Sequence, residues 1–170
     1  MDLKLHRPLS ACARTNRPFV PGETFYSALV RSQGRLERID CAADAWQGPP
    51  PQTIAWWRSV YPTGEPAGST LAPPDVLLDV LEQLEGRPDD AALRYLVALQ
   101  LVRRRVLRIT DRPKTTAGEH TAGERAGDAL ILACRKRESE YRVQVVPMQA
   151  AAVAGLEEQL SSLLWSGDAA

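Results

Sequence analysis

A proline- and glycine-rich segment, PTGEPAGSTLAPP at residues 62–74, divides the 170-residue chain into two parts with different hydrophobic patterns. Before this segment, apolar residues mostly alternate, as they do in β-strands; after it, they first recur at helical spacing. Proline and glycine at this density interrupt both helices and strands. We therefore predict an α+β protein with a β-rich module over residues 1–61, a linker over 62–74 and an α+β module over 75–170.

The first module is expected to form a small antiparallel sheet. Residues 24–31 alternate between two faces, residues 36–41 form the return strand of a hairpin, and residues 53–61 form a further strand. Adjacent side chains on a strand point to opposite faces. One of the neighbours Trp56 and Trp57 is therefore expected in the core, with the other at an edge or against a partner.

The second module is predicted to run helix, helix, three-stranded meander, helix. Leu77, Val80, Leu81 and Leu84 have the i, i+3, i+4, i+7 spacing of a helix that faces a core. Glycine-rich tandem repeats, TAGEH and TAGER within residues 114–127, indicate an expanded hairpin loop. The expected helices begin at Pro73, Ala91 and Pro147, and the expected strands cover residues 106–110, 129–136 and 141–146.

Composition indicates an ordinary soluble domain. Apolar residues make up 44% of the chain and charged residues 25%, and the formal net charge is zero. The apolar stretch at residues 91–102 is too short to span a bilayer, and residues 1–8 lack the apolar core of a secretory signal. Three cysteines, an odd number, favour reduced thiols. We therefore predict a cytoplasmic protein with no membrane partner.

Two short motifs flank the expected hairpin. The first is Cys12-x-x-Thr15-Asn16-Arg17 and the second is Cys41-x-x-Asp44. Over residues 10–46 this order resembles a degenerate rubredoxin-like zinc ribbon, in which two Cys-x-x-Cys turns are bridged by a hairpin. The resemblance implies a ribbon-like β-module and a role in binding protein or nucleic acid. Asn16 replaces the usual glycine, and asparagine is well suited to a left-handed turn conformation.

A structural zinc site needs four ligands. Thr15 is a very poor ligand and Asp44 a weaker one than cysteine. We therefore interpret Cys12, Thr15, Cys41 and Asp44 as vestigial positions and predict a module without metal or other cofactor. The alternative interpretation is that both cysteines are small buried hydrophobic residues.

Catalytic patterns are weak. The two histidines, His6 and His120, lie in an N-terminal segment and in the glycine-rich repeat, where fixed catalytic geometry is not expected. Cys134 has no sequence neighbour that would activate it. We therefore predict no catalytic residues. A thiol-dependent enzyme, using Cys134 or the corner formed by Cys12 and Asp44, is the third functional hypothesis.

Non-catalytic recognition of another protein is the favoured function, and nucleic-acid binding is the alternative. Aromatic and basic side chains recur together in the first module, where they would anchor a partner or stack on bases. A second basic cluster covers residues 103–108. Both groups also have plainer interpretations, as core tryptophans and as a solvated helix end. The predicted binding surface consists of Arg17, Arg35, Arg38, Trp56, Trp57 and Arg58.

Overall fold

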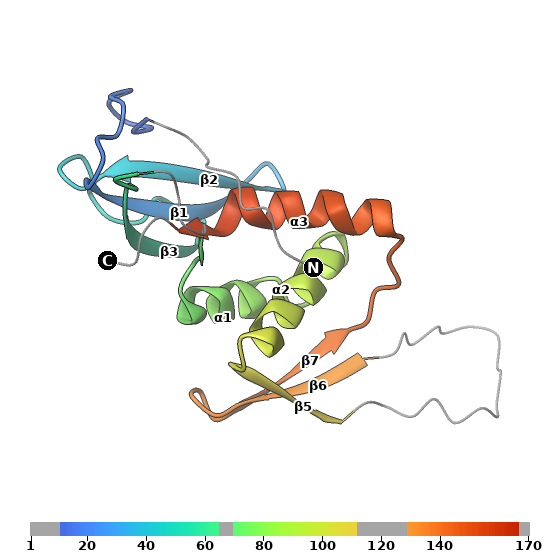
Figure 1. Ribbon diagram of the computed structural model, residues 1–170. Helices are drawn as coiled ribbons and strands as arrows, with labels where there is room; N and C mark the ends of the chain where they lie inside the picture. Colours follow the sequence, from blue (N-terminus) through green and yellow to red (C-terminus); the bar gives the residue numbers. More distant parts are fainter. Residues whose placement is uncertain (1–10, 65–69, 112–128, 167–170) are drawn as a thin grey trace, which may run out of the picture.

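The structure, a computed structural model, describes residues 11–64, 70–111 and 129–166 (Figure 1). Predictions made for His6, His120 and the loop at residues 114–127 lie outside these ranges. The strands are β1 (Thr24–Ser32), β2 (Arg35–Ala42), β3 (Thr53–Val60), β4 (Thr70–Leu71), β5 (Leu107–Asp111), β6 (Ala129–Cys134), β7 (Ser139–Gln144) and β8 (Trp165–Ser166). The helices are α1 (Pro74–Gln83), η1 (Pro88–Asp90), α2 (Ala91–Arg103) and α3 (Ala150–Leu164). This content confirms the predicted α+β class.

The first sheet has the order β2-β1-β3 and is antiparallel throughout. Its inner face carries Phe25, Leu29 and Trp57, all of which are buried. Its outer face carries Tyr26 and Trp56, and Trp56 is 48% exposed. The two adjacent tryptophans therefore lie on opposite faces, as strand geometry predicts.

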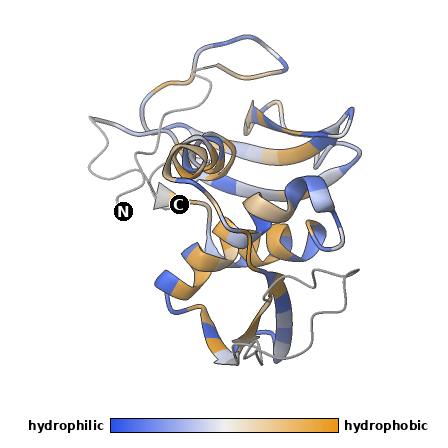
Figure 2. Cartoon of the chain, turned by 90° about the vertical axis from the view of Figure 1, so that its right-hand side faces the viewer, coloured by the Kyte–Doolittle hydropathy of each residue, from blue (hydrophilic) through white to orange (hydrophobic). Residues whose placement is uncertain are grey.

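Helices α1 and α2 lie between the first sheet and a second antiparallel sheet of order β5-β6-β7, and α3 lies beside the first sheet (Figures 1 and 2). Helix α1 contacts β3, and α2 contacts β5 and β7, while α3 contacts β2. Hydrophobic colouring is concentrated on the helices and central strands in Figure 2. The predicted order of helix, helix, meander and helix is confirmed.

Apolar side chains from both sides of residues 62–74 share one core. Leu29 and Trp57 of the first sheet belong to the same buried cluster as Leu77 of α1 and Leu132 of β6. Within the segment predicted as a linker, β4 pairs with β8. This pairing brings Trp165 into a second buried cluster with Phe25, among side chains that otherwise come from residues 12–61.

Short irregular segments contain the residues next to the two cysteines. Residues 43–45 form a hydrogen-bonded turn in which the N–H of Ala45 donates to the carbonyl of Ala42 at 3.0 Å. Ala11 forms a β-bridge with Pro18.

Candidate functional site: the cysteine corner and the outer aromatic surface

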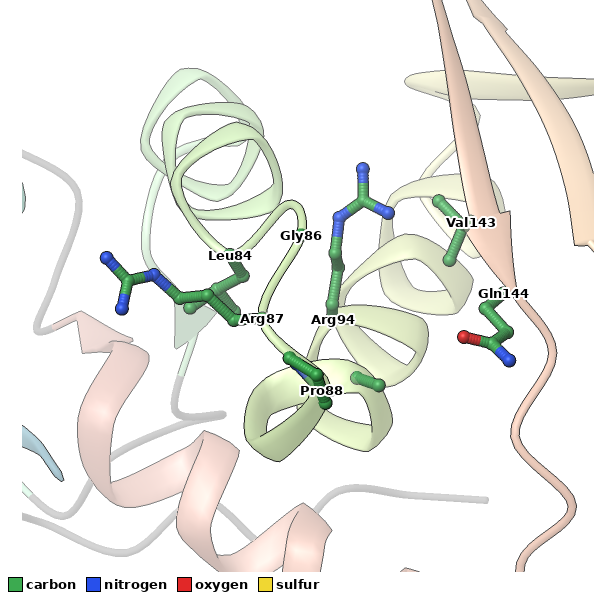
Figure 3. Close-up of a pocket in the computed structure, with 8 residues that line it drawn as sticks. Leu84, Gly86, Arg87, Pro88, Arg94, Val143 and Gln144 are labelled. Atoms are coloured by element: carbon green, nitrogen blue, oxygen red, sulfur yellow. The ribbon is translucent and has the colours of Figure 1, made fainter. Parts of the chain in front are cut away.

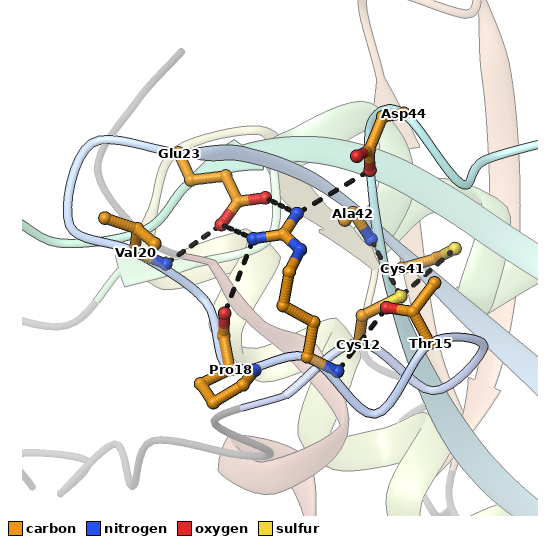
Figure 4. Close-up of polar contacts among 9 residues, drawn as sticks. Cys12, Thr15, Pro18, Val20, Glu23, Cys41, Ala42 and Asp44 are labelled. Atoms are coloured by element: carbon orange, nitrogen blue, oxygen red, sulfur yellow. Dashed lines mark hydrogen bonds and ion pairs between the residues drawn. The ribbon is translucent and has the colours of Figure 1, made fainter.

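The two Cys-x-x motifs meet at one corner of the first sheet (Figure 4). Cys12 precedes the first turn and Cys41 lies near the end of β2, with their Sγ atoms 3.8 Å apart. Asn16 has φ of 54°, which confirms the left-handed conformation expected there. Its N–H donates to the carbonyl of Cys12 at 2.9 Å and so closes the turn.

The donor set at this corner does not fit a structural zinc ion. Two thiolates on one tetrahedral zinc, at a Zn–S distance of about 2.3 Å, would lie about 3.8 Å apart, so the sulfur spacing alone is suitable. Asp44, however, is exposed and its carboxylate lies 3.7 Å from the guanidinium of Arg17. Within the ranges that the structure describes, no three His, Cys, Asp or Glu side chains gather as metal ligands.

Hydrogen bonds hold the corner instead. The N–H of Ala42 donates to Sγ of Cys12 at 3.4 Å, and the N–H of Ala13 donates to the carbonyl of Asp40 at 2.8 Å. Arg17 forms a bidentate ion pair with Glu23, in which its Nη1 donates to Oε2 of Glu23 at 3.1 Å. The hydrogen bond from Arg17 lowers the pKa of Glu23 against the opposing effect of burial. Arg17 therefore links the turn after Cys12 to Glu23, just before β1, and to Asp44 in the turn after β2.

The environments of the two thiols differ. For Cys12, burial raises the pKa, but a hydrogen bond with Thr15 and backbone hydrogen bonds, including that of Ala42, outweigh it and lower the pKa to about 7. For Cys41, burial and the neighbouring Cys12 raise the pKa to about 11. Cys12 therefore has the lower pKa of the two thiols and thiolate character near neutral pH.

The outer face of the first sheet carries an aromatic cluster formed by Tyr26, Trp46 and Trp56. The rings of Tyr26 and Trp46 are stacked, with centroids 5.0 Å apart and an interplanar angle of 14°. Trp56 lies 6.0 Å from each of them. The segment after β2 places Trp46 against the sheet, because Arg14 donates to the carbonyl of Ala45 at 3.0 Å.

A pocket of about 510 Å³ adjoins the aromatic cluster. Ile39 and Cys41 of β2 contribute to it, together with Trp46 and the proline run at residues 49–51. Concave, largely apolar sites of this kind bury a ligand side chain well. The aromatic cluster and this pocket form a continuous outer surface through Trp46.

The six residues of the predicted binding surface do not all lie on it. Trp56, Arg58 and Arg35 are exposed, and Arg17 is partly exposed but paired with Glu23.

The placement of Arg38 and Trp57 needs correction, because both are buried on the inner face. Arg38 pairs with Asp40 at 2.8 Å, and its guanidinium lies between the rings of Trp57 and Trp165 at 5.2 and 5.5 Å.

Tyr26 and Trp46 lie outside the six residues of the predicted binding surface. In the register of β1 and β3, Tyr26 lies opposite Arg58 and Ala28 lies opposite Trp56. Tyr26 and Trp56 are therefore diagonal neighbours on the same face of the sheet. An antiparallel alignment of the two predicted strands would therefore have placed Tyr26 beside Trp56. The approach of Trp46 depends on the path of the turn after β2, which the alternation of the strands does not specify.

A smaller pocket of about 240 Å³ lies beside Arg94 (Figure 3). The guanidinium of Arg94 extends between the end of α1 and β7, where it donates to the carbonyl of Leu81 at 3.0 Å and to that of Arg142 at 2.8 Å. Its remaining nitrogen lies 3.6 Å from the carboxylate of Glu85. These contacts make Arg94 a cross-link between α1, α2 and β7.

A third pocket, of about 500 Å³, lies where α2 meets β5 and contains part of the predicted basic cluster. The pocket is bordered by three arginines, Arg105, Arg108 and Arg135. Among the residues that the structure describes, no carboxylate lies within 4 Å of their guanidinium groups. The neighbouring Arg104 donates to the carbonyl of Ala72 at 3.2 Å. Cys134 of β6 is buried, with 2% of its surface exposed.

Comparisons with known proteins add no assignment. No protein-family model matches the chain, and neither the curated proteins nor the solved structures include a significant match. Within the described residues, every helix is too short or too polar to cross a membrane.

Proposed function

We propose that the protein is a non-catalytic module that binds another protein through the aromatic cluster of Tyr26, Trp46 and Trp56. One observation carries the proposal. The sheet exposes 48% of Trp56 to solvent on its outer face, next to a pocket, while Trp57 fills the inner core. Tryptophan and tyrosine are enriched among the residues that dominate protein–protein binding energy.

The charges around the cluster favour a protein over a nucleic acid at this face. Arg17 is held by Glu23, and Arg14 donates to a backbone carbonyl. Tyr26 and Trp46 stack on each other, which covers one face of each ring and so reduces the ring surface open to bases. An apolar side chain of a partner, in contrast, would pack against Trp56 and enter the adjoining pocket.

Replacing Trp56 with alanine is expected to weaken binding of the partner protein about 30-fold, since truncation of a central aromatic anchor costs about 2 kcal/mol. The partner is first identified by capture on the immobilised wild-type protein and then purified. Its affinity for both forms is measured by isothermal titration calorimetry. The loss should appear without a change in the circular dichroism spectrum, because Trp56 lies on the surface.

Val20→Ala is the matched control. Val20 is 57% exposed and is the other large exposed hydrophobic residue in the described part of the chain, but it lies outside the cluster. Its replacement should leave the affinity unchanged. Equal affinity of Trp56→Ala and wild type for every captured partner would refute the proposed surface.

Nucleic-acid binding remains the second candidate, supported by the three arginines around the pocket at β5. Arg105, Arg108 and Arg135 are exposed, and no carboxylate of the described ranges lies within 4 Å of their guanidinium groups. Phosphate groups are the partners that such a set attracts most generally. Arg35 and Arg58 are exposed on the first sheet, which lies on the other side of helices α1 and α2 from this pocket (Figure 1).

Salt dependence separates the two candidates. If the second is correct, random single-stranded or duplex DNA or RNA binds at 50 mM salt and loses affinity steeply by 200 mM, as fluorescence anisotropy would show. The triple variant Arg105→Ala, Arg108→Ala, Arg135→Ala should then reduce the log–log salt slope by about 3, roughly 1 per lost phosphate contact. Absence of binding at 50 mM salt would eliminate this candidate.

A further inference from the structure

We propose that Cys12 and Cys41 are a modification site, at which hydrogen peroxide or another small hydroperoxide converts the two thiols into an intramolecular disulfide. The proposal rests on the geometry of the corner and is independent of the proposed function. It gives the pair a chemical role that does not require the two metal ligands that the corner lacks.

The backbone already holds the two cysteines side by side. The hydrogen bond from Ala13 to Asp40 joins the residue after Cys12 to the residue before Cys41. A second hydrogen bond, from the N–H of Ala42 to Sγ of Cys12, holds this sulfur at the end of β2 (Figure 4). The sulfurs lie 3.8 Å apart, and a disulfide needs about 2.05 Å. Small rotations of both side chains bring the sulfurs together.

The two sulfurs also suit the two roles that the reaction requires. Cys12, whose Sγ accepts a hydrogen bond from the N–H of Ala42 at 3.4 Å, supplies the thiolate, and Cys41, with its Sγ 3.8 Å away, supplies the second thiol. The thiolate of Cys12 attacks one peroxide oxygen, the O–O bond breaks, and the departing hydroxide takes a proton to become water. Cys12 is then a sulfenic acid.

The second step forms the disulfide. Sγ of Cys41 attacks Sγ of Cys12, the S–S bond forms, and the S–O bond breaks. The hydroxyl group leaves as a second water with the proton from Cys41. In total, two thiols are oxidised and one peroxide molecule is reduced to two waters.

Access favours a small oxidant. Cys12 is fully buried and Cys41 is 2% exposed, which excludes direct attack by a bulky disulfide on the closed corner. Cys41 nevertheless contributes to the pocket of about 510 Å³, together with Ala13 and Arg14. Peroxide is close to water in size, so a small local opening beside this pocket is enough to admit it to Cys12. Cys134 lies on β6 in the second sheet and serves as an internal control.

The test uses the full chain, purified under reducing conditions and then desalted. The native protein is treated with a small excess of hydrogen peroxide, quenched with catalase, unfolded and alkylated, and its mass is measured. We expect two of the three cysteines to escape alkylation until dithiothreitol is added. Peptide mapping should show Cys12 linked to Cys41, and Cys134→Ser should form the same link.

Single variants assign the roles. In Cys41→Ser, oxidation should stop at the sulfenic acid of Cys12, which dimedone traps, whereas Cys12→Ser should form no link. If either variant fails to fold, the wild-type peptide map alone decides. Alkylation of all three cysteines after treatment, or a link through Cys134, would overturn the proposal. One zinc per chain in the purified protein that protects both thiols would overturn it as well.

Discussion

Replacing Asp40 with alanine is expected to lower the free energy of unfolding by about 3–5 kcal/mol, because it leaves the charge of Arg38 buried without its partner. The side chains of Asp40 and Arg38 are 1% and 4% exposed, and Arg38 donates to Asp40 at 2.8 Å. Ser27 donates to the same carboxylate at 2.6 Å. Burial already lowers the pKa of Arg38 against the effect of Asp40, so the surroundings penalise its charge. Urea unfolding measures the loss.

Two further variants identify the cause. The double variant Arg38→Met, Asp40→Ala removes the buried charge together with its partner and should lose less stability than Asp40→Ala alone. Glu37→Ala removes an exposed carboxylate from the same strand and should change stability by no more than about 0.5 kcal/mol. If the double variant is the least stable of the three, the explanation based on an unpaired charge is wrong.

Replacing Trp165 with alanine is expected to lower the free energy of unfolding by about 3–5 kcal/mol, because it opens a cavity where β8 packs against the first sheet. Trp165 is 2% exposed and stacks on Phe25, with ring centroids 6.3 Å apart. Its ring also covers the guanidinium of Arg38. Because the core contains side chains from both predicted modules, the wild type and variant should each unfold in a single transition.

Two control variants separate the loss of ring volume at Trp165 from the loss of its indole N–H and from a general effect of removing tryptophan. Trp165→Phe keeps an aromatic ring and removes an indole N–H that has no hydrogen-bond partner among the described residues, so it should cost less than about 1.5 kcal/mol. Trp56→Ala, on the exposed face, should cost less than Trp165→Ala. Fluorescence and circular dichroism are followed together in urea. Separate transitions for the two probes would contradict a shared core.

Much of the fold follows from local patterns. Alternation over residues 24–31 and 53–61 predicts β1 and β3, and the stripe from Leu77 to Leu84 predicts α1, since these periods follow from backbone geometry. The left-handed conformation of Asn16 was also predictable, because a positive φ depends on one residue and its turn. Predictions of this kind depend on neighbours in sequence.

The candidate site was harder to predict because it depends on distant residues. Alternation shows that Trp56 and Trp57 face opposite ways, but it does not show which face is covered. That choice depends on helices α1 and α3 and on Trp165, whose carbonyl accepts a hydrogen bond from Arg38 across 127 positions. Arginine is usually a surface residue, and this general preference led to the wrong placement of Arg38.

The pairing of β4 with β8 has a consequence for synthesis. During synthesis β1, β2 and β3 emerge before β8, and the cluster of Phe25, Tyr61 and Cys12 is completed only by Trp165. Contacts between residues so far apart in sequence slow folding, because a long loop must close before they form. The part of the inner face that Trp165 covers is therefore exposed until β8 has been synthesised. A chain halted before β8 would present Phe25 and the charge of Arg38 without their cover, which predicts that such truncated chains are prone to aggregate.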